Sequence, residues 1–410
     1  MSTKREILKK YGETFNIIKY VEREMRTFAE KPFSDEDSLV LAQACYMEFD
    51  NAVPSVEIKM GGKSFAEIYK AELFPGIFDN IQMKENNFAL FSALCRSPRF
   101  RDVKINHPVE ITNSKIEEQF SATAFVLPGG DIYIGYRGTD ASIVGWKEDF
   151  YMLIEPAIQS QYTALEYLES IAAISDGEIM LGGHSKGGTL ALYRASCCRE
   201  KTRRRITAVY NHDGPGLAGA IRESSEYDAV KPLVKTTIPQ QSLIGIIMND
   251  GDYSVVYSDA KGIFQHDPYT WQMSEDGFVW ADKISKTSDK MENALDEMLS
   301  ELSEDEKKLA VETVFRVIES TGETNFPDWP QSALKEYEKI IATIKEIDGD
   351  TVKKISNTVM TMIKIVFRNM IDVEMPSPAA TLENAFANIK NQFSKIGKSE
   401  NGEVNSDNCR

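Results

Sequence analysis

A serine stands between two glycines in the segment Gly183-His-Ser-Lys-Gly187. The G-x-S-x-G spacing is typical of a nucleophile elbow, a sharp strand-to-helix turn that exposes a serine hydroxyl. The glycines are needed because side chains at their positions would collide with the neighbouring strand and helix. The apolar run Ile179–Leu181 predicts a buried strand before the turn, and a helix-like segment follows it. This context predicts that Ser185 is a nucleophile.

A serine hydroxyl is a poor nucleophile until a base removes its proton, and that base is usually a histidine held by a carboxylate. The chain has four histidines. Hydrolases with such an elbow carry the serine, the acid and the histidine in that order along the chain. His107 and His184 come before the serine, and His212 leaves no room for an acid on an intervening strand. His266, in the segment Ile263–Trp271, fits the order and is the predicted base.

The acid is expected just after a strand that lies between the serine and His266. The apolar run Ser242–Met248 predicts such a strand, and Asp250 and Asp252 follow it. Both aspartates are also part of Asn-Asp-Gly-Asp, which is strong turn chemistry. We favour Asp252 as the acid and keep Asp250 as the alternative.

Two further polar residues are expected to line the substrate-binding site. Asp213, in Asn211-His-Asp-Gly-Pro-Gly216, is a third candidate for the acid, but it comes early in the chain for that role. We expect its carboxylate to bond backbone groups in a Gly-Pro turn at the site. His184 lies inside the elbow, with its side chain directed away from the reaction face of the serine.

The tetrahedral intermediate of acyl transfer needs two or more N–H donors for its oxyanion. One donor is expected to be the backbone N–H of Lys186, directly after the serine, and another to come from a loop after an earlier strand. The segment Tyr136-Arg-Gly-Thr-Asp140 ends such a strand, and Thr139 offers a hydroxyl besides its N–H. An ordinary strand-ending turn is the alternative interpretation of Arg137-Gly138.

The elements around these residues indicate an α/β protein. Two strand-like runs, Phe120–Leu127 and Ile132–Tyr136, flank a Pro-Gly-Gly turn and predict a hairpin. Helical periodicity over Ile158–Ile174 precedes the elbow strand, and another strand is predicted at Ile206–Tyr210. Strands that alternate with helices indicate a mostly parallel sheet covered by helices on both faces.

The chain divides into four segments by pattern. Residues 1–29 alternate charged and apolar positions at helical spacing and predict a helical N-terminal segment; residues 30–284 form the α/β catalytic domain. The pattern predicts a C-terminal helical region over residues 285–398 and a polar, disordered tail over residues 399–410. An apolar stripe over Val352–Ile371 favours packing in a core over a membrane-surface helix.

Three motifs, in chain order, resemble the class 3 lipase branch of the α/β-hydrolases: Tyr136-Arg-Gly-Thr139, Trp146-x-x-Asp149 and Gly-His-Ser-Lys-Gly. The segments Tyr210–Leu217, Ser242–Gly245 and Gln265–Trp271 resemble still more closely a bacterial lipase-like family of unknown function. The resemblance covers roughly residues 30–285. It implies an α/β-hydrolase fold in which Ser185 is the nucleophile and Thr139 and Lys186 are the oxyanion donors. By the same resemblance, Asp252 is the acid and His266 is the base.

Composition excludes several classes of partner. The formal net charge is −16, and no basic block exceeds Arg203–Arg205. This balance argues against nucleic acid as a partner and against electrostatic docking on anionic lipid. The five cysteines have neither metal-ligand nor disulfide-framework spacing, which fits a reducing compartment.

We expect a cytoplasmic protein. No apolar h-region follows the basic residues near Met1, so no signal peptide is expected, and no apolar run approaches the length of a membrane span. The predicted chemistry implies neither a metal nor an organic cofactor.

The leading hypothesis is a serine esterase or lipase-like acyl hydrolase, in which Ser185 attacks an ester carbonyl and His266 transfers the proton. The substrate class is then a small-molecule or lipid ester. A second hypothesis is a degenerate hydrolase that acts as a non-catalytic interaction scaffold. A third keeps the acyl-enzyme but changes the acceptor or the bond cleaved, which gives an acyltransferase or a peptidase, because fold and triad do not name the substrate.

Overall fold

The computed structural model describes residues 4–53, 61–286 (except 80, 141, 153, 156, 218 and 250), 288 and 302–325, with isolated residues between 332 and 343. These residues form two compact units. The first contains residues 1–140 and 155–296, and the second contains residues 141–154 and 297–410. The candidate catalytic residues belong to the first unit.

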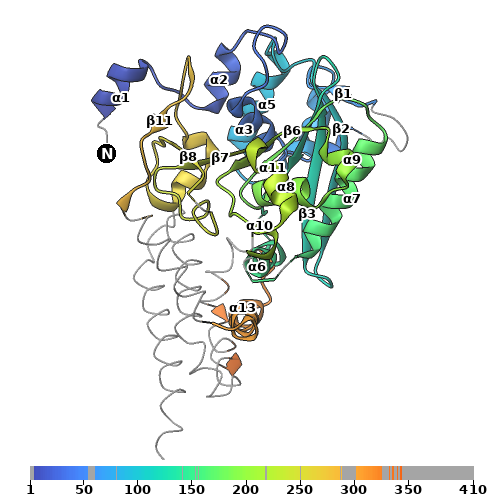
Figure 1. Cartoon of the computed structure of the whole chain (residues 1–410), viewed down its shortest axis with the longest axis vertical. Coiled ribbons are helices and arrows are strands. Elements are labelled where there is room, and N and C mark those ends of the chain that lie inside the picture. Colours follow the sequence, from blue (N-terminus) through green and yellow to red (C-terminus); the bar gives the residue numbers. More distant parts are fainter. Residues whose placement is uncertain are drawn as a thin grey trace, which may run out of the picture. The chain divides into compact units, whose positions relative to one another are not determined.

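The first unit is built on a nine-stranded sheet (Figure 1). Its central strands β4 to β8 run parallel, while the strands at both edges pair antiparallel. In their order across the sheet, the strands are β1 (Lys63–Ser64), β2 (Lys104–Asn113), β3 (Glu118–Val126), β4 (Ile132–Tyr136), β5 (Ile179–His184), β6 (Ile206–His212), β7 (Val234–Pro239), β8 (Ser254–Val256) and β11 (Trp280–Ala281).

Helices of the first unit cover this sheet, and the predicted α/β class is confirmed. Outside this sheet, β9 (Met273–Ser274) and β10 (Gly277–Phe278) pair antiparallel as a separate two-stranded sheet. The described helices of this unit are α1 (Lys4–Tyr11), α2 (Ile17–Arg23), α3 (Asp35–Ala44), α4 (Phe74–Phe78), α5 (Lys84–Arg96), α7 (Gln159–Ala173), α8 (Lys186–Cys197), α9 (Glu200–Arg203), α10 (Gly219–Arg222) and α11 (Ser225–Val230).

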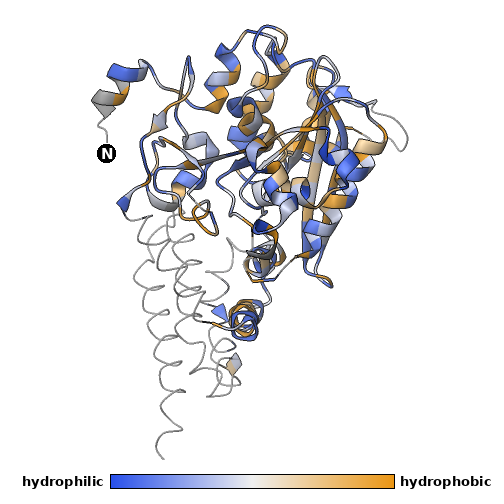
Figure 2. Cartoon of the chain, viewed as in Figure 1, coloured by the Kyte–Doolittle hydropathy of each residue, from blue (hydrophilic) through white to orange (hydrophobic). Residues whose placement is uncertain are grey.

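Side-chain alternation along the strands produces two separate apolar layers. On β5, Ile179 and Leu181 pack in the layer with α7 and α8, whereas Met180 packs in the layer with α2, α3 and α5. On β4, Ile134 and Tyr133 divide between the same two layers. Because both faces are covered, strands of the sheet contain hydrophobic stretches, which are orange in Figure 2. The prediction of helices on both faces is therefore confirmed.

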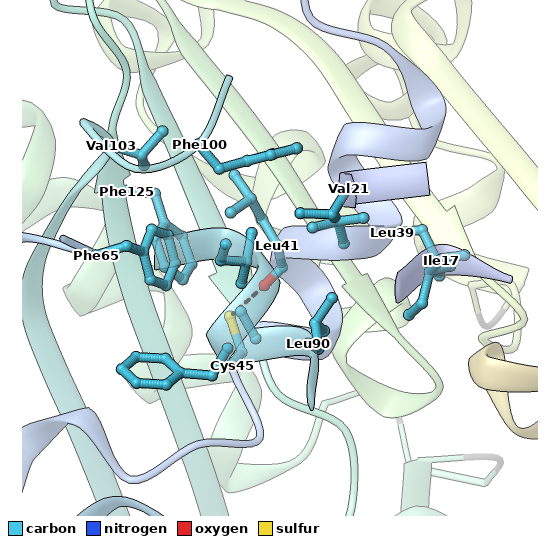
Figure 3. Close-up of a cluster of buried hydrophobic side chains, with 14 of the residues drawn as sticks. Ile17, Val21, Leu39, Leu41, Cys45, Phe65, Leu90, Phe100, Val103 and Phe125 are labelled. Atoms are coloured by element: carbon cyan, nitrogen blue, oxygen red, sulfur yellow. Dashed lines mark hydrogen bonds between the residues drawn. The ribbon is translucent and has the colours of Figure 1, made fainter. Parts of the chain in front are cut away.

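The layer on the N-terminal side joins residues that are far apart in the chain. Ile17 and Val21 of α2 and Leu39 of α3 belong to the same buried cluster as Phe125 of β3 (Figure 3). Asp37 and Arg99 form a fully buried ion pair beside this layer, in which Arg99 Nε donates to Asp37 Oδ1 over 2.8 Å. The N-terminal helices are thus part of the core that supports the sheet.

Most of the predicted elements near the elbow are present. The hairpin is formed by β3 and β4, which pair antiparallel, and the turn between them has Gly129 and Gly130 at positive φ. The helix predicted over Ile158–Ile174 is α7, and the predicted elbow strand and helix are β5 and α8. The predicted strand at Ile206–Tyr210 is β6.

The prediction of a strand over Ser242–Met248 is wrong. These residues form consecutive turns, and the strand that pairs with β6 is β7, formed by Val234–Pro239. The run is apolar because Ile246 and its neighbours pack against Ile238 and Val255. Its backbone does not extend because Ser242 and Gly245 turn to contact a buried carboxylate, described below.

The second unit contains α6 (Ile143–Met152) and α13 (Glu304–Glu319). Ile143 N donates to Thr324 O over 2.9 Å, and the rings of Phe150 and Phe315 lie 5.6 Å apart. Helix α6, within the span predicted for the catalytic domain, therefore packs with α13. The predicted apolar stripe at 352–371 and the predicted tail at 399–410 lie outside the described residues.

Candidate active site

Ser185 occupies a strained turn between β5 and α8. Its backbone has φ 57° and ψ −133°, a conformation that a residue with a side chain rarely adopts. Ser185 N donates to His212 O over 3.0 Å, and Gly188 N donates to Ser185 O over 2.9 Å. These bonds fix the turn between two parallel strands and the first turn of the helix.

The flanking glycines are required by close backbone approaches. A Cβ on Gly183 would lie 2.3 Å from the carbonyl carbon of Gly187. A Cβ on Gly187 would lie 2.0 Å from the Tyr136 carbonyl oxygen. The glycines of the sequence motif are thus explained by contacts with the helix and with the adjacent strand.

His266 is paired with Asp213. The Oδ2 atom of Asp213 lies 2.7 Å from Nδ1 of His266. The Asp213 side chain is buried, with 1% of its surface exposed, while the His266 side chain is 26% exposed. The structure therefore brings the predicted base to a carboxylate, and that carboxylate follows β6 directly.

The carboxylate of Asp213 is held on its other side by the turns at Ser242–Met248. Ser242 Oγ donates to Oδ1, and Gly245 N donates to the same oxygen over 3.1 Å. Gly245 has no room for a side chain, because a Cβ there would lie 2.4 Å from Oδ1. Asp213 itself has φ 52°, and its N–H donates to Thr237 O over 2.8 Å. One oxygen is thus fixed by the protein, and the other faces the imidazole.

The prediction of Asp252 as the partner of His266 needs correction. The Asp252 side chain is 71% exposed and lies 3.0 Å from Lys231 Nζ. The error follows from the strand assignment, because the strand predicted before Asp252 is in fact a series of turns. Asp250, the alternative, lies outside the described residues. Asp213, expected to bond backbone and line the substrate site, is the carboxylate that meets the histidine.

The segment that carries His266 is two short 3₁₀ turns, η4 (Gly262–His266) and η5 (Pro268–Thr270). The buried Trp271 donates from Nε1 to Gln265 O over 2.7 Å. The Gln265 side chain accepts from Gln241 N over 2.7 Å and donates to Ala260 O over 2.8 Å. These bonds position a loop residue, and no local sequence pattern predicts them.

His184 lies against His266. The two ring centroids are 4.4 Å apart, and Nε2 of His184 lies 2.8 Å from the backbone oxygen of His266. Its Nδ1 atom lies 3.2 Å from the Tyr46 hydroxyl. Burial lowers the pKa of His184 well below that of an ordinary histidine, and the neighbouring His266 lowers this pKa further. No motif or spacing in the sequence predicts the contact with Tyr46.

The predicted oxyanion residues flank Ser185. A Cβ on Gly138 would lie 3.1 Å from the Ser185 Cβ, so the loop that contains Thr139 passes beside the serine. Lys186 is the first residue of α8, and its buried side chain donates from Nζ to Gln119 O and Oε1 over 2.8 and 2.6 Å. Its ammonium group is therefore directed to β3.

Ser185 Oγ makes no hydrogen bond with any residue that the structure describes, His266 included. Catalytic hydrogen bonds in ligand-free enzymes are often long and tighten only when substrate binds. The strands still bring the two segments together, because a Cβ on Gly214, next to Asp213, would lie 2.2 Å from the Ser185 carbonyl oxygen.

Two other kinds of feature are absent from the described part of the chain. No group of three or more histidine, cysteine, aspartate or glutamate side chains there is placed to hold a metal ion. No helix in the same part is long and apolar enough to cross a membrane.

The fold and these residues agree with a family assignment. The chain belongs to the Mbeg1-like family, whose profile matches residues 94–316, more than half of the sequence. Membership in this family confirms the lipase-like α/β-hydrolase resemblance inferred from the motifs. No curated protein matches the chain.

Among solved structures, three similar chains are lipases. M37 lipase is 15% identical with a TM-score of 0.33, and the match covers 52% of this chain and 70% of that chain. A fungal lipase–inhibitor complex is 14% identical with a TM-score of 0.34, and the match covers 70% and 94%. A triacylglycerol lipase with a serine protease triad is 14% identical with a TM-score of 0.35, and the match covers 62% and 86%.

Proposed function

We propose that the protein is a serine hydrolase that cleaves carboxylic esters through an acyl-enzyme on Ser185. The observation that carries the proposal is the pairing of His266 with the buried carboxylate of Asp213, which lies in a segment that touches the strained Ser185 turn. A buried carboxylate on Nδ1 of a histidine is the arrangement that makes Nε2 a base for a serine hydroxyl.

The direction of proton transfer follows from the hydrogen-bond roles. A carboxylate only accepts, so Nδ1 of His266 carries the hydrogen and Nε2 keeps its lone pair. Nε2 then removes the proton from Ser185 as the oxygen attacks the ester carbonyl. The resulting imidazolium is stabilised by Asp213 and later donates its proton to the leaving alcohol.

The oxyanion of the tetrahedral intermediate would be bound at the start of α8. Lys186 is the first residue of α8, and the first N–H groups of a helix are directed out of its N-terminus, so the backbone N–H of Lys186 is the proposed first donor. The positive end of the twelve-residue helix dipole adds to this donor. Thr139, in the loop beside Ser185, is the proposed second donor.

Deacylation repeats the same steps with water in place of the alcohol. His266 removes a proton from water as its oxygen attacks the acyl carbonyl, and the intermediate then expels Ser185 Oγ, which takes this proton back from His266. These steps use side chains, backbone groups and water alone. The proposed substrates are small-molecule or lipid esters, the class cleaved by this acyl-enzyme chemistry.

A panel of p-nitrophenyl esters, graded from acetate to palmitate, tests this function. We expect the full chain to release p-nitrophenol from at least one ester, and we expect Ser185→Ala to fall to the background rate. The acyl length with the highest kcat/KM would define the substrate range. Equal turnover by wild type and Ser185→Ala would contradict the proposal, and absence of turnover on every ester would favour an acyltransferase, a peptidase or a scaffold.

A further inference from the structure

His184 is a buried residue with two hydrogen-bond partners. Only 5% of the His184 surface is exposed. Its Nε2 atom meets the carbonyl oxygen of His266, and its Nδ1 atom meets the Tyr46 hydroxyl. A side chain with both ring nitrogens occupied in this way has no polar atom left for a substrate.

The carbonyl partner fixes the tautomer of His184. A carbonyl oxygen can only accept, so Nε2 must carry a hydrogen and donate it to His266 O. Burial and the neighbouring His266 lower the pKa of His184, so the ring is neutral and Nδ1 is an acceptor. The Tyr46 hydroxyl therefore donates to Nδ1. The result is a directed chain of donors from Tyr46 through His184 to the backbone of His266.

Tyr46, the residue that contacts Nδ1 of His184, comes from the N-terminal part of the chain. It follows α3, which packs on β4, β5 and β6. Its hydroxyl oxygen lies 2.2 Å from where a Cβ on Gly138 would be, so it fills the space beside the proposed oxyanion loop. Tyr46 precedes residues 94–316, the region matched by the family profile.

From these contacts we propose that Tyr46 and His184 are positioning residues that hold the catalytic base His266. The proposal rests on the proposed function, and it replaces the expectation that His184 contacts substrate. Asp213 holds the imidazole of His266 through Nδ1, and His184 holds the backbone carbonyl of His266. Two anchors are needed because His266 lies on a loop, and a displacement of the base by about 1 Å can reduce catalysis roughly 10²-fold.

The test measures how fast a fluorophosphonate probe modifies the full-length chain, as a function of probe concentration. The limiting rate reports the serine and its base, and the half-saturating concentration reports probe binding. We compare His184→Leu, His184→Gln and Tyr46→Phe with wild type. The matched control is Tyr167→Phe, which also loses a buried tyrosine hydroxyl bond, from Tyr167 to the carbonyl oxygen of His107.

We expect His184→Leu to lower the limiting rate by roughly 10²-fold with the half-saturating concentration unchanged. His184→Gln should recover most of the rate, because its amide N–H₂ can donate to the same carbonyl. Tyr46→Phe should lower the limiting rate by roughly fivefold, the effect of one lost hydrogen bond. Tyr167→Phe should leave both quantities unchanged.

Three results would overturn the inference. His184→Leu could raise the half-saturating concentration and keep the limiting rate, which is the behaviour of a substrate-binding residue. Tyr46→Phe and Tyr167→Phe could lower the rate equally, which is a general packing effect. Wild type and all variants could react alike. An unreactive wild type would instead remove the proposed function itself. If His184→Leu does not fold, the Gln and Phe variants still decide the question.

Discussion

The two oxygens of Asp213 have different partners, and this division explains how a turn residue can hold the imidazole of His266, the proposed base. Oδ1 accepts hydrogen bonds from Ser242 and Gly245, while Oδ2 is left for Nδ1 of His266. A carboxylate held by two donors keeps its orientation in a buried site. The imidazole is therefore presented in one tautomer, with Nε2 free to accept a proton.

Comparing the kcat of Asp213→Asn with that of Asp252→Asn tests which aspartate acts with His266. We expect Asp213→Asn to lower kcat by roughly 10³- to 10⁴-fold, because an amide cannot hold the imidazole in the required tautomer. Asp252→Asn removes an exposed ion pair with Lys231 and should leave kcat within about twofold of wild type. Ester hydrolysis at saturating substrate measures both. The reverse pattern would restore Asp252 as the acid.

The sequence alone predicts part of this arrangement. The elbow motif predicts Ser185, and chain order predicts His266. The sequence does not predict that Asp213 contacts His266, because Ser242–Met248 has the composition of a buried strand, whereas its backbone turns to contact Asp213. A signal for Asp213 is present, since it directly follows β6, the strand that pairs with the elbow strand. Contacts with Tyr46 and Gln265 come from tertiary structure, and no spacing in the chain encodes them.

Among the elements, the strand–turn–helix unit depends on backbone packing. Helix α8 approaches β4 so closely that Gly187 touches the carbonyl oxygen of Tyr136. The elbow conformation is strained, and the surrounding contacts maintain it. The unit is thus stable only when its glycines are retained.

Gly187→Ala should destabilise the protein by about 3 kcal/mol, because its Cβ would force α8 away from the strand. Gly219→Ala is the matched control, since Gly219 lies exposed in α10 and a Cβ there would meet no atom within 4 Å. That change should shift stability by no more than about 0.5 kcal/mol. Urea unfolding followed by circular dichroism measures both. Equal midpoints for the two variants would contradict the close approach.

The sequence predicts the elements unevenly, for physical reasons. β3, β4, β5 and β6 are apolar because both faces of the sheet are covered, so their sequences stand out. β7 and β8 escape prediction, because β7 is rich in threonine and β8 is three residues long. β2 contains Pro108 and changes register between Asn106 and Val109, which interrupts the alternation expected of a strand.

Buried histidines make the free energy of unfolding of the protein depend on pH. His212 is fully buried, with Nε2 2.9 Å from Ser38 Oγ, and burial lowers the pKa of His212 to about 3. His184 also has a lowered pKa. Between pH 6.5 and 3 the unfolded chain binds a proton on His212 and the folded chain does not, so this contribution to stability is complete above pH 6.5 and falls as the pH decreases.

We expect the free energy of unfolding to decrease between about pH 6.5 and 5, with His212 contributing about 1.4 kcal/mol per pH unit. His212→Gln keeps a side chain that can bond Ser38 but cannot titrate, so its slope should be smaller by about that amount. Urea titrations at several pH values measure the slopes, above the range where most carboxylates titrate. Identical slopes for wild type and His212→Gln would contradict the buried neutral histidine.

The family match at 94–316 extends across residues of both compact units, because α6 and α13 belong to the second. The predicted boundary at residue 284 remains a prediction. Pattern alone assigns α6 to the catalytic span because it lies between β4 and α7 in the chain. Its contacts with Thr324 and Phe315 are long-range, and local periodicity does not encode them.

The central claim is that Ser185 becomes covalently acylated, and peptide mass spectrometry after reaction with a fluorophosphonate tests it most directly. We predict one adduct per chain, on the peptide that contains Ser185, with no adduct in Ser185→Ala and a strongly slowed reaction in His266→Ala. An adduct on another residue of the folded protein, or undiminished labelling of Ser185→Ala, would contradict the account.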